Sequence, residues 1–234
     1  RAVYVSEDLR AWAEPLLGVP AHLGQVVHNG VRFPKPSFRG TEREECGAES
    51  GELLVGAVGN VRAPKDYSNL LRAAALVCAV RSDVRFVIVG DDRGDLPQAL
   101  KRRAADLGLA ERVRFLGFRD DVTELAGSLD VFVSSSRTEG LPLATVEAVA
   151  TGTPVVLTRV GGVPEVVESG VTGRLVAPGD PQALADGILE TLADPAGSAR
   201  MADAGRRDVR ERFAARRMCD AYQDLYERMI SKGA

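Results

Sequence analysis

The chain has 234 residues, of which 45% are hydrophobic and 27% are charged, and its formal net charge is −3. This length allows one large domain with ample core, or one domain and part of another. A mixed, slightly acidic surface gives no electrostatic reason to expect nucleic-acid binding, and no apolar stretch approaches the roughly 20 residues that cross a membrane.

The beginning of the chain predicts a small piece of α/β structure. Residues 1–32 favour a strand, a helix over Glu7 to Leu17 and a second strand over Gln25 to His28. These residues are too few to bury a core alone. Because the chain begins at Arg1, already inside a strand pattern, we expect 1–32 to be a remnant of an N-terminal domain. Residues 33–52 are rich in Pro, Gly and charge, and they predict a linker.

From Leu53 onward, short apolar runs alternate with helical patterns at intervals of roughly 20–25 residues, which predicts a parallel sheet with helices on both faces. The predicted strands are 53–58, 85–89, 113–116, 130–133, 154–157 and 173–176. The predicted helices are 67–80, 96–107, 122–128, 141–150, 163–168 and 181–192. Right-handed crossovers bring the carboxyl ends of such strands to one edge of the sheet, where we expect the ligand.

An amphipathic pattern over 214–231 predicts a last helix, which on the simplest interpretation packs on its own domain. If the N-terminal domain is missing, we expect both ends of the chain to expose apolar side chains, namely those of Trp12, Leu16, Tyr222 and Tyr226.

The cysteines argue against a disulfide framework or a zinc site. Cys46, Cys78 and Cys219 are odd in number and widely spaced, and only His22 and His28 could add imidazole ligands. Cys78 lies in an apolar run and is expected in the core. Three thiols suit a reducing cytoplasm.

Two carboxylates, Glu139 and Glu147, flank a predicted strand–loop–helix junction that contains Gly140, Leu141 and Pro142. The fixed φ of Pro142 suits a first helical turn, and the free amides of such a turn favour a phosphate. One carboxylate before this anion site and one inside the helix suit a ligand with hydroxyls on both sides of a diphosphate, such as a nucleotide-sugar. In a chain with 33 acidic residues, two solvated charges are the alternative.

A second loop, from Gly59 to Lys65, follows the 53–58 strand at the same edge. Glycine lets the backbone approach a ligand closely, a guanidinium such as Arg62 suits bidentate phosphate contact, and the ammonium of Lys65 supplies a compact charge. The alternative is that Arg62 and Lys65 are ordinary surface residues.

Three further turns carry weaker signals. Gly90-Asp91-Asp92 is not a dinucleotide-binding turn, because Gly-x-Gly-x-x-Gly is absent from the chain. Gly161-Gly162 could offer backbone amides or serve as a structural turn. Phe118 and Arg119 could lie near a nucleobase or form a capped strand end before Asp121. The chain also lacks an Asp-x-Asp motif, so no metal site is expected.

These motifs together resemble the C-terminal domain of retaining glycosyltransferases of family 4, also called group 1. Their GT-B architecture has two facing Rossmann-like domains. The resemblance extends from about residue 30 to residue 230. It is carried by 29–31, 59–65, 115–118 with Asp121-Val122, 139–147, 150–156, 161–165 and 170–173.

The resemblance implies roles for the residues named above. Glu139 contacts the donor sugar, Glu147 contacts the ribose, and Arg62 and Lys65 bind the diphosphate beside Gly59. The amides of Gly140 and Leu141 assist, and the stretch around Phe118 and Arg119 flanks the base. The chain departs from the family at Asp66, which stands where a glycine commonly follows the lysine.

The implied fold is a Rossmann-like, doubly wound parallel sheet, with 53–213 as the donor-binding domain and 214–234 as a helix that crosses back to the N-terminal domain. The implied reaction transfers a sugar to an unidentified hydroxyl acceptor with retention, and needs neither metal nor cofactor. Glu139, Arg62 and Lys65 form the catalytic set. The isolated fragment should be inactive, and the missing domain could touch a membrane surface. The alternatives are a non-catalytic nucleotide-sugar-binding half and a nucleotide-sugar epimerase of the same architecture.

Overall fold

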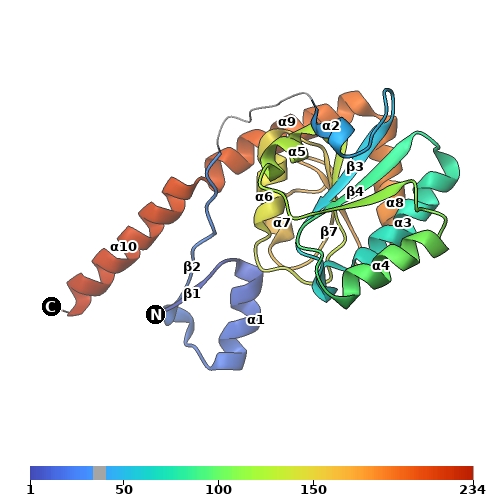
Figure 1. Ribbon diagram of the computed structural model, residues 1–234. Helices are drawn as coiled ribbons and strands as arrows, with labels where there is room; N and C mark the ends of the chain where they lie inside the picture. Colours follow the sequence, from blue (N-terminus) through green and yellow to red (C-terminus); the bar gives the residue numbers. More distant parts are fainter. Residues whose placement is uncertain (34–40, 234) are drawn as a thin grey trace.

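A computed structural model describes residues 1–33 and 41–233 of the chain. Its centre is a six-stranded parallel sheet in the order β5-β4-β3-β6-β7-β8 (Figure 1). The strands are β3 (Leu53–Val58), β4 (Val84–Val89), β5 (Val113–Gly117), β6 (Val131–Ser134), β7 (Val155–Thr158) and β8 (Arg174–Val176). Every strand predicted in this region is found, and the doubly wound parallel sheet is confirmed.

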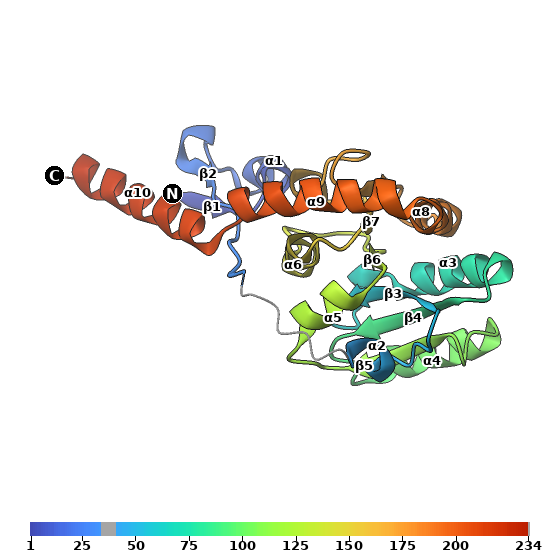
Figure 2. The ribbon, with the colours of Figure 1, turned by 90° about the horizontal axis from the view of Figure 1, so that it is seen from above.

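Helices cover both faces of this sheet (Figure 2). One face carries α3 (Tyr67–Val80), α4 (Asp95–Asp106) and α8 (Pro181–Ala193). The other carries α5 (Val122–Ser128), α6 (Leu143–Thr151), α7 (Val163–Val166) and α9 (Pro195–Arg212). Along β4, Phe86 and Ile88 enter the first layer while Val87 and Val89 enter the second, because successive side chains of a strand point to opposite faces. Strands buried on both faces read as continuous apolar runs, which is why they were visible in the sequence.

The strand order reverses beside β3, which pairs with β4 on one side and with β6 on the other. The connections that follow β3 and β6 therefore leave the sheet on opposite sides. In open α/β sheets the crevice at such a reversal, outside the carboxyl ends of the strands, is the usual place for a ligand. The loops after these two strands carry Lys65 and Glu139.

Two helix boundaries within the domain differ from the prediction by two residues, and the others predicted there differ by one at most. Helix α6 begins at Leu143, and Pro142 precedes it with an extended backbone (φ −77°, ψ 103°) instead of opening the helix. Pro142 therefore serves as the residue before the first turn, and Gly140 and Leu141 belong to the loop. Helix α7 ends at Val166, because Val167 is extended.

Helix α9 was absent from the sequence-based prediction. It has 18 residues, and its buried positions are Ser198, Ala202, Gly205 and Val209. These positions have helical spacing, but three of the four residues are small, so that the apolar pattern on which the prediction relied is weak. Small side chains suit this helix because it packs closely on α6.

The N-terminal residues and the last helix form a separate lobe (Figure 1). The lobe contains β1 (Ala2–Tyr4), α1 (Glu7–Leu17), the short 3-10 turn η1 (Ala21–Leu23), β2 (Gly24–Val26) and α10 (Ala215–Gly233). Strands β1 and β2 pair in parallel, and β2 ends earlier than predicted. The lobe is joined to the domain where Val31 N donates to Phe213 O at 2.8 Å and Ala215 N donates to Val31 O at 3.0 Å.

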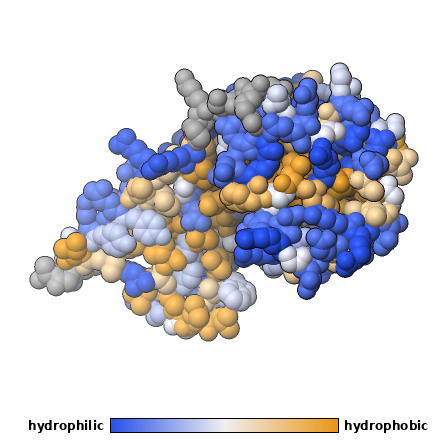
Figure 3. Space-filling view, viewed as in Figure 1, coloured by the Kyte–Doolittle hydropathy of each residue, from blue (hydrophilic) through white to orange (hydrophobic). Residues whose placement is uncertain are grey.

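The lobe carries apolar side chains on its surface, and Figure 3 shows hydrophobic residues gathered over it. Trp12, Leu16 and Tyr226 are 65%, 67% and 58% exposed, as expected. Tyr222 is only partly exposed, because it lies against Tyr226 with 6.3 Å between ring centroids. Among the residues described, no helix is both long and apolar enough to span a bilayer.

Part of the predicted linker packs on the domain. Helix α2 (Glu42–Glu45) follows residues 34–40, which lie outside the described residues. Arg43 donates to Ser128 O at 2.7 Å and to Asp130 Oδ2 at 2.9 Å, and Cys46 is fully buried in the second layer. The second half of the segment thus contributes to the core, while the domain boundaries stay a prediction.

Candidate donor-binding site

Two of the predicted site residues meet at the crevice. The Nζ atom of Lys65, at the end of the turn η2 (Ala63–Lys65) after β3, lies 2.7 Å from Oε1 of Glu139, in the loop after β6. Their side chains are 26% and 11% exposed. The structure therefore brings together residues that are 74 positions apart in the sequence. It places a cation and a carboxylate at the reversal point of the sheet.

Sequence reasoning missed two neighbours of this pair. Ser136 donates from Oγ to the same Oε1 of Glu139 at 2.7 Å, and Tyr67 donates from its hydroxyl to Gly59 O at 2.7 Å. Burial, reinforced by the negative charge of Glu139, raises the pKa of the Tyr67 phenol far above its ordinary range, so that this hydroxyl stays a donor. Ser136 lies in the loop predicted after the 130–133 strand, where no signal distinguished it, and no local signal singled out Tyr67.

Gly59 is closed in by the same residues. A Cβ at this position would lie 3.0 Å from Cε of Lys65 and 3.3 Å from the Tyr67 hydroxyl. A side chain here would press against the lysine. The absence of a side chain at Gly59 therefore lets Lys65 extend across the start of the loop toward Glu139.

The turn after β7 supports the Glu139 loop from behind. Gly162 N donates to Gly140 O at 2.8 Å. Gly161 has φ +50°, and a Cβ on it would lie 1.7 Å from Glu139 O, so that only glycine fits this contact. Of the two interpretations offered for Gly161-Gly162, the structure favours the structural turn.

The remaining predicted residues lie elsewhere along the same edge. Arg62 is exposed. The hydrogen bonds of Arg93, with a smaller contribution from the charge of Arg62, lower the pKa of Asp91 to about 2. The charge of Arg62 is thus felt at the loop after β4, while Lys65 contacts Glu139. Phe118, after β5, is 72% exposed.

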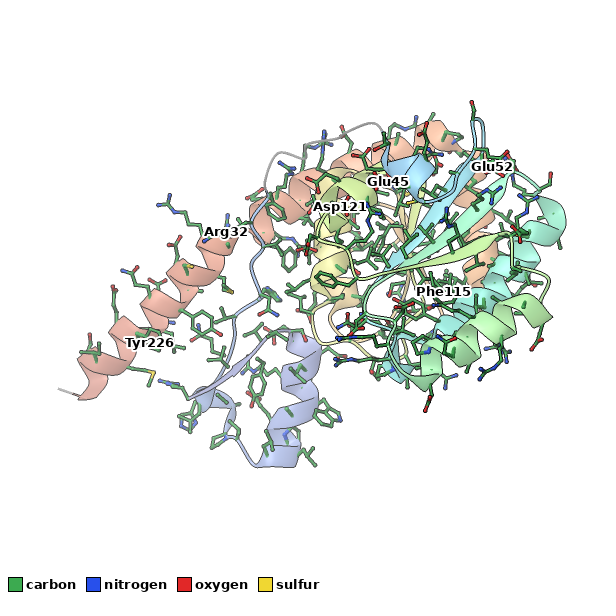
Figure 4. The ribbon with its side chains drawn as sticks, viewed as in Figure 1. Arg32, Glu45, Glu52, Phe115, Asp121 and Tyr226 are labelled. Carbon is green, nitrogen blue, oxygen red and sulfur yellow. The ribbon has the colours of Figure 1, made fainter. Side chains whose placement is uncertain are left out.

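Arg119 is occupied by acidic partners. It donates from Nε to Asp121 Oδ1 at 2.7 Å, and its NH2 group lies 2.5 Å from Glu45 Oε2. These hydrogen bonds raise the pKa of Arg119 further, so that its charge is permanent. Figure 4 shows Glu45 and Asp121 close together where α2 meets α5. In this structure the guanidinium joins α2 to the domain.

Glu147 lies in the second turn of α6 and is half-buried. Burial raises the pKa of its carboxyl above the ordinary value of 4.5. It lines a small pocket with Arg32, Phe33, Thr123, Ala150, Thr151 and Arg210. Glu139 and Glu147 thus lie in two different surroundings, the first against Lys65 and the second in this pocket. Within the described ranges, no cluster of three or more His, Cys, Asp or Glu side chains suits a metal ion.

Comparisons with known proteins give a consistent result. Residues 38–208 match the family described as Glycosyl transferases group 1. D-inositol 3-phosphate glycosyltransferase of Mycolicibacterium gilvum is 39% identical over 167 residues, which are 68% of this chain and 37% of that protein. N-acetyl-alpha-D-glucosaminyl L-malate synthase of Bacillus anthracis is 31% identical over 184 residues, which are 79% of this chain and 48% of that protein.

Solved structures show the same fold. The crystal structure of Anabaena Alr3699/HepE in complex with UDP-glucose has a TM-score of 0.87 at 29% identity, covering 98% of this chain and 63% of that one. Sucrose-phosphate synthase of Thermosynechococcus elongatus has a TM-score of 0.87 at 26% identity, covering 98% of this chain and 58% of that one. The chain spans less than half the length of the two relatives named above.

The sheet order, the crevice and these similarities define a Rossmann-like domain of the GT-B type. The chain belongs to the glycosyl transferases group 1 family, since the family match covers most of its residues. The resemblance drawn from the sequence is thereby confirmed.

Proposed function

We propose that this chain is the donor-binding part of a retaining glycosyltransferase, which moves a sugar from a nucleoside diphosphate sugar to a hydroxyl acceptor. The observation that carries the proposal is the contact of 2.7 Å between Lys65 and Glu139 at the reversal point of the sheet. It joins a cation suited to a phosphate and a carboxylate suited to sugar hydroxyls in one crevice.

Lys65 can serve both partners. An ammonium has three N–H donors, so that one can remain on Glu139 while the others reach phosphate oxygens. In the reaction, the bond between the anomeric carbon and the diphosphate oxygen breaks, the acceptor oxygen bonds to that carbon, and the hydroxyl proton passes to the departing diphosphate. Negative charge then grows on the leaving diphosphate, where Lys65, Arg62 and the amides of Gly140 and Leu141 would stabilise it. We propose that these groups replace a metal ion.

The other roles follow from the positions along the edge. Glu147, in its pocket on α6, would accept hydrogen bonds from the ribose hydroxyls. Phe118, exposed after β5, would offer a surface for the nucleobase, and Arg119 would hold the loop that presents it. UDP-sugars are the first donors to test, because the similar Anabaena structure contains UDP-glucose.

The experiment is calorimetry with UDP-, GDP-, ADP- and TDP-sugars, followed by the Lys65→Ala variant with the preferred donor. Loss of one charge-assisted contact, worth roughly 1.5–3 kcal/mol, should weaken binding of the nucleoside diphosphate about 10- to 150-fold and leave the nucleoside unchanged. Arg206→Ala is the control, because Arg206 pairs with nearby Asp203 on α9, at 2.6 Å. Equal losses for nucleoside and diphosphate in Lys65→Ala would refute the assignment.

We further propose that the chain alone binds a donor without transferring its sugar, and that the protein acts in the cytoplasm. The chain spans 37% and 48% of the two relatives, so that an acceptor-binding domain would have to be supplied by further sequence. The names of both relatives indicate acceptors with hydroxyl groups. Turnover of a nucleotide-sugar by these 234 residues in the presence of inositol phosphate or malate would overturn the first statement.

A further inference from the structure

Asp66, directly after Lys65, has an unusual backbone. It is the one non-glycine residue with positive φ in the described parts of the chain, with φ 44° and ψ 48°. L-residues other than glycine adopt this left-handed conformation at a cost, although Asp and Asn tolerate it best. A residue that stays in this conformation is held there by its surroundings.

The surroundings of Asp66 come from the loop after β6. Its carboxylate is nearly buried and accepts from Arg137 Nε at 2.6 Å and from Asn69 N, at the start of α3, at 3.3 Å. Two backbone contacts run parallel to this ion pair. Arg137 N donates to Pro64 O at 2.8 Å, and Ser135 Oγ donates to Lys65 O at 2.8 Å.

These contacts join the two loops that carry the proposed donor site. On one loop, Lys65 lies between Pro64 and Asp66, which are both bound by Arg137. On the other loop, Arg137 is two residues before Glu139, the partner of Lys65. The ion pair and the two hydrogen bonds therefore link the two loops at the point where the ammonium meets the carboxylate.

We propose that Asp66 and Arg137 are positioning residues for the donor reaction: their ion pair holds Lys65 and Glu139 at the spacing that a sugar diphosphate requires. The inference rests on the proposed function and deepens it. A lysine on a mobile loop loses conformational entropy when it binds phosphate, whereas a lysine that is already held in place loses less. Asp66 acts through Lys65 and does not itself contact the donor.

Three variants separate this role from a general effect on folding. Asp66→Gly keeps the left-handed backbone without strain but removes the carboxylate. Asp66→Asn keeps the conformation and the cap on α3 but removes the charge. Arg137→Gln breaks the pair from the other side. The matched control is Arg81→Gln, which breaks an ion pair of 2.6 Å with Asp83 before β4, at the opposite edge of the sheet.

The assay is calorimetry with the nucleotide-sugar that the wild-type chain binds best, and with the corresponding nucleoside. Affinity for the nucleotide-sugar should fall about 5- to 30-fold in Asp66→Gly and Arg137→Gln, less in Asp66→Asn, and not in the control. Nucleoside affinity should stay unchanged, which a loss of folding would not allow. The Asp66→Gly, Arg137→Gln double variant should bind no worse than either single variant, because both remove the same ion pair.

The outcomes distinguish the two proposals. If the wild type binds a donor and Lys65→Ala weakens it, but Asp66→Gly does not, then the positioning role is wrong and the proposed function stands. If Arg137→Gln is far worse than Asp66→Gly and the effects add, Arg137 contacts the donor itself and the positioning role is again refuted.

Crystal structures without ligand test the inference even if the wild type binds none of the donors, an outcome that would remove the proposed function. Asp66→Gly should lose the contact between Lys65 Nζ and Glu139 Oε1. Retention of that contact, with residues 62–66 unmoved, would overturn the positioning role.

Discussion

Replacement of Glu165 should release the N-terminal residues from the domain. This carboxylate, on α7, accepts from the backbone amides of Glu7 at 3.1 Å and Asp8 at 3.2 Å, and lies 2.7 Å from His28 Nε2. The first amides of a helix have no partner inside the helix. Glu165, on the domain, thus caps α1. Ser6, which directly precedes this helix, accepts from the next amide, Leu9 N, at 3.1 Å.

The size of the effect follows from these contacts. Loss of a helix cap costs about 0.5–2 kcal/mol. The contact with His28 joins side chains that are 33% and 21% exposed, so that it adds at most about 1 kcal/mol. The sum, about 0.5–3 kcal/mol, corresponds to a rise of about 2- to 150-fold in the equilibrium for local opening of α1 and β2.

Hydrogen exchange followed by mass spectrometry measures this opening. In Glu165→Ala, peptides from residues 2–28 should exchange faster, while those from β3 and β4 keep wild-type protection. Glu168→Gln is the control, because Glu168 is a nearby acidic residue that is exposed. Unchanged exchange over residues 2–28 in Glu165→Ala would refute the capping role. Accelerated exchange over the whole chain would indicate general unfolding instead.

Three further predictions concern individual side chains. Glu147→Gln should weaken the binding of nucleoside diphosphate and nucleotide-sugar alike, whereas Glu139→Gln should weaken mainly the binding of the nucleotide-sugar. Calorimetry measures the ratio of the two affinities in each variant, and the same ratio in both variants would contradict this division. Burial raises the folded-state pKa of Glu147 above its ordinary 4.5, so ionisation of this carboxyl lowers the stability of the fold as pH rises from 4.5 to the folded-state pKa. Glu147→Gln should therefore have a higher Tm than wild type at neutral pH and lose this advantage below pH 4.5. A Tm difference that does not change with pH would exclude the carboxyl as its source. Burial raises the pKa of Cys46 to about 11. An alkylating reagent at pH 8 should therefore label exposed Cys219 and spare Cys46 until the protein unfolds. Rapid labelling of both thiols would contradict the packing of α2.

The sheet was predictable from the sequence for a physical reason. Its strands are buried on both faces, and the resulting apolar runs are local features that need no knowledge of the rest of the chain. The spacing of Glu139 and Glu147, and the position of Lys65 after the first strand of the sheet, are equally local. The parallel topology then places the loops that carry Lys65 and Glu139 at one crevice.

Contacts between distant residues were not predictable in this way. Helix α9 buries small side chains such as Ala202 and Gly205, which leave little apolar periodicity. The environment of Arg119 depends on Glu45, 74 positions earlier, and the predicted role at the base did not anticipate this partner. In the same way, Arg62 and Lys65 were predicted to act together, but Lys65 contacts Glu139 while Arg62 stays exposed.

Asp66 combines a feature that is visible in the local sequence with a contact to a distant residue. The sequence alone identified it as a departure from the lysine–glycine pair of related proteins, and a glycine at that position would adopt a left-handed backbone without strain. The structure shows that the aspartate adopts the same left-handed backbone. Its carboxylate then gains Arg137 as a partner, which a glycine could not. An aspartate in place of glycine at this positive φ thus brings some backbone strain, and it gains an ion pair that joins the two loops of the site. The comparison of Asp66→Gly with Asp66→Asn measures that pair, since the glycine restores the common residue and removes both the ion pair and the hydrogen bond to Asn69 N, whereas the asparagine keeps that cap.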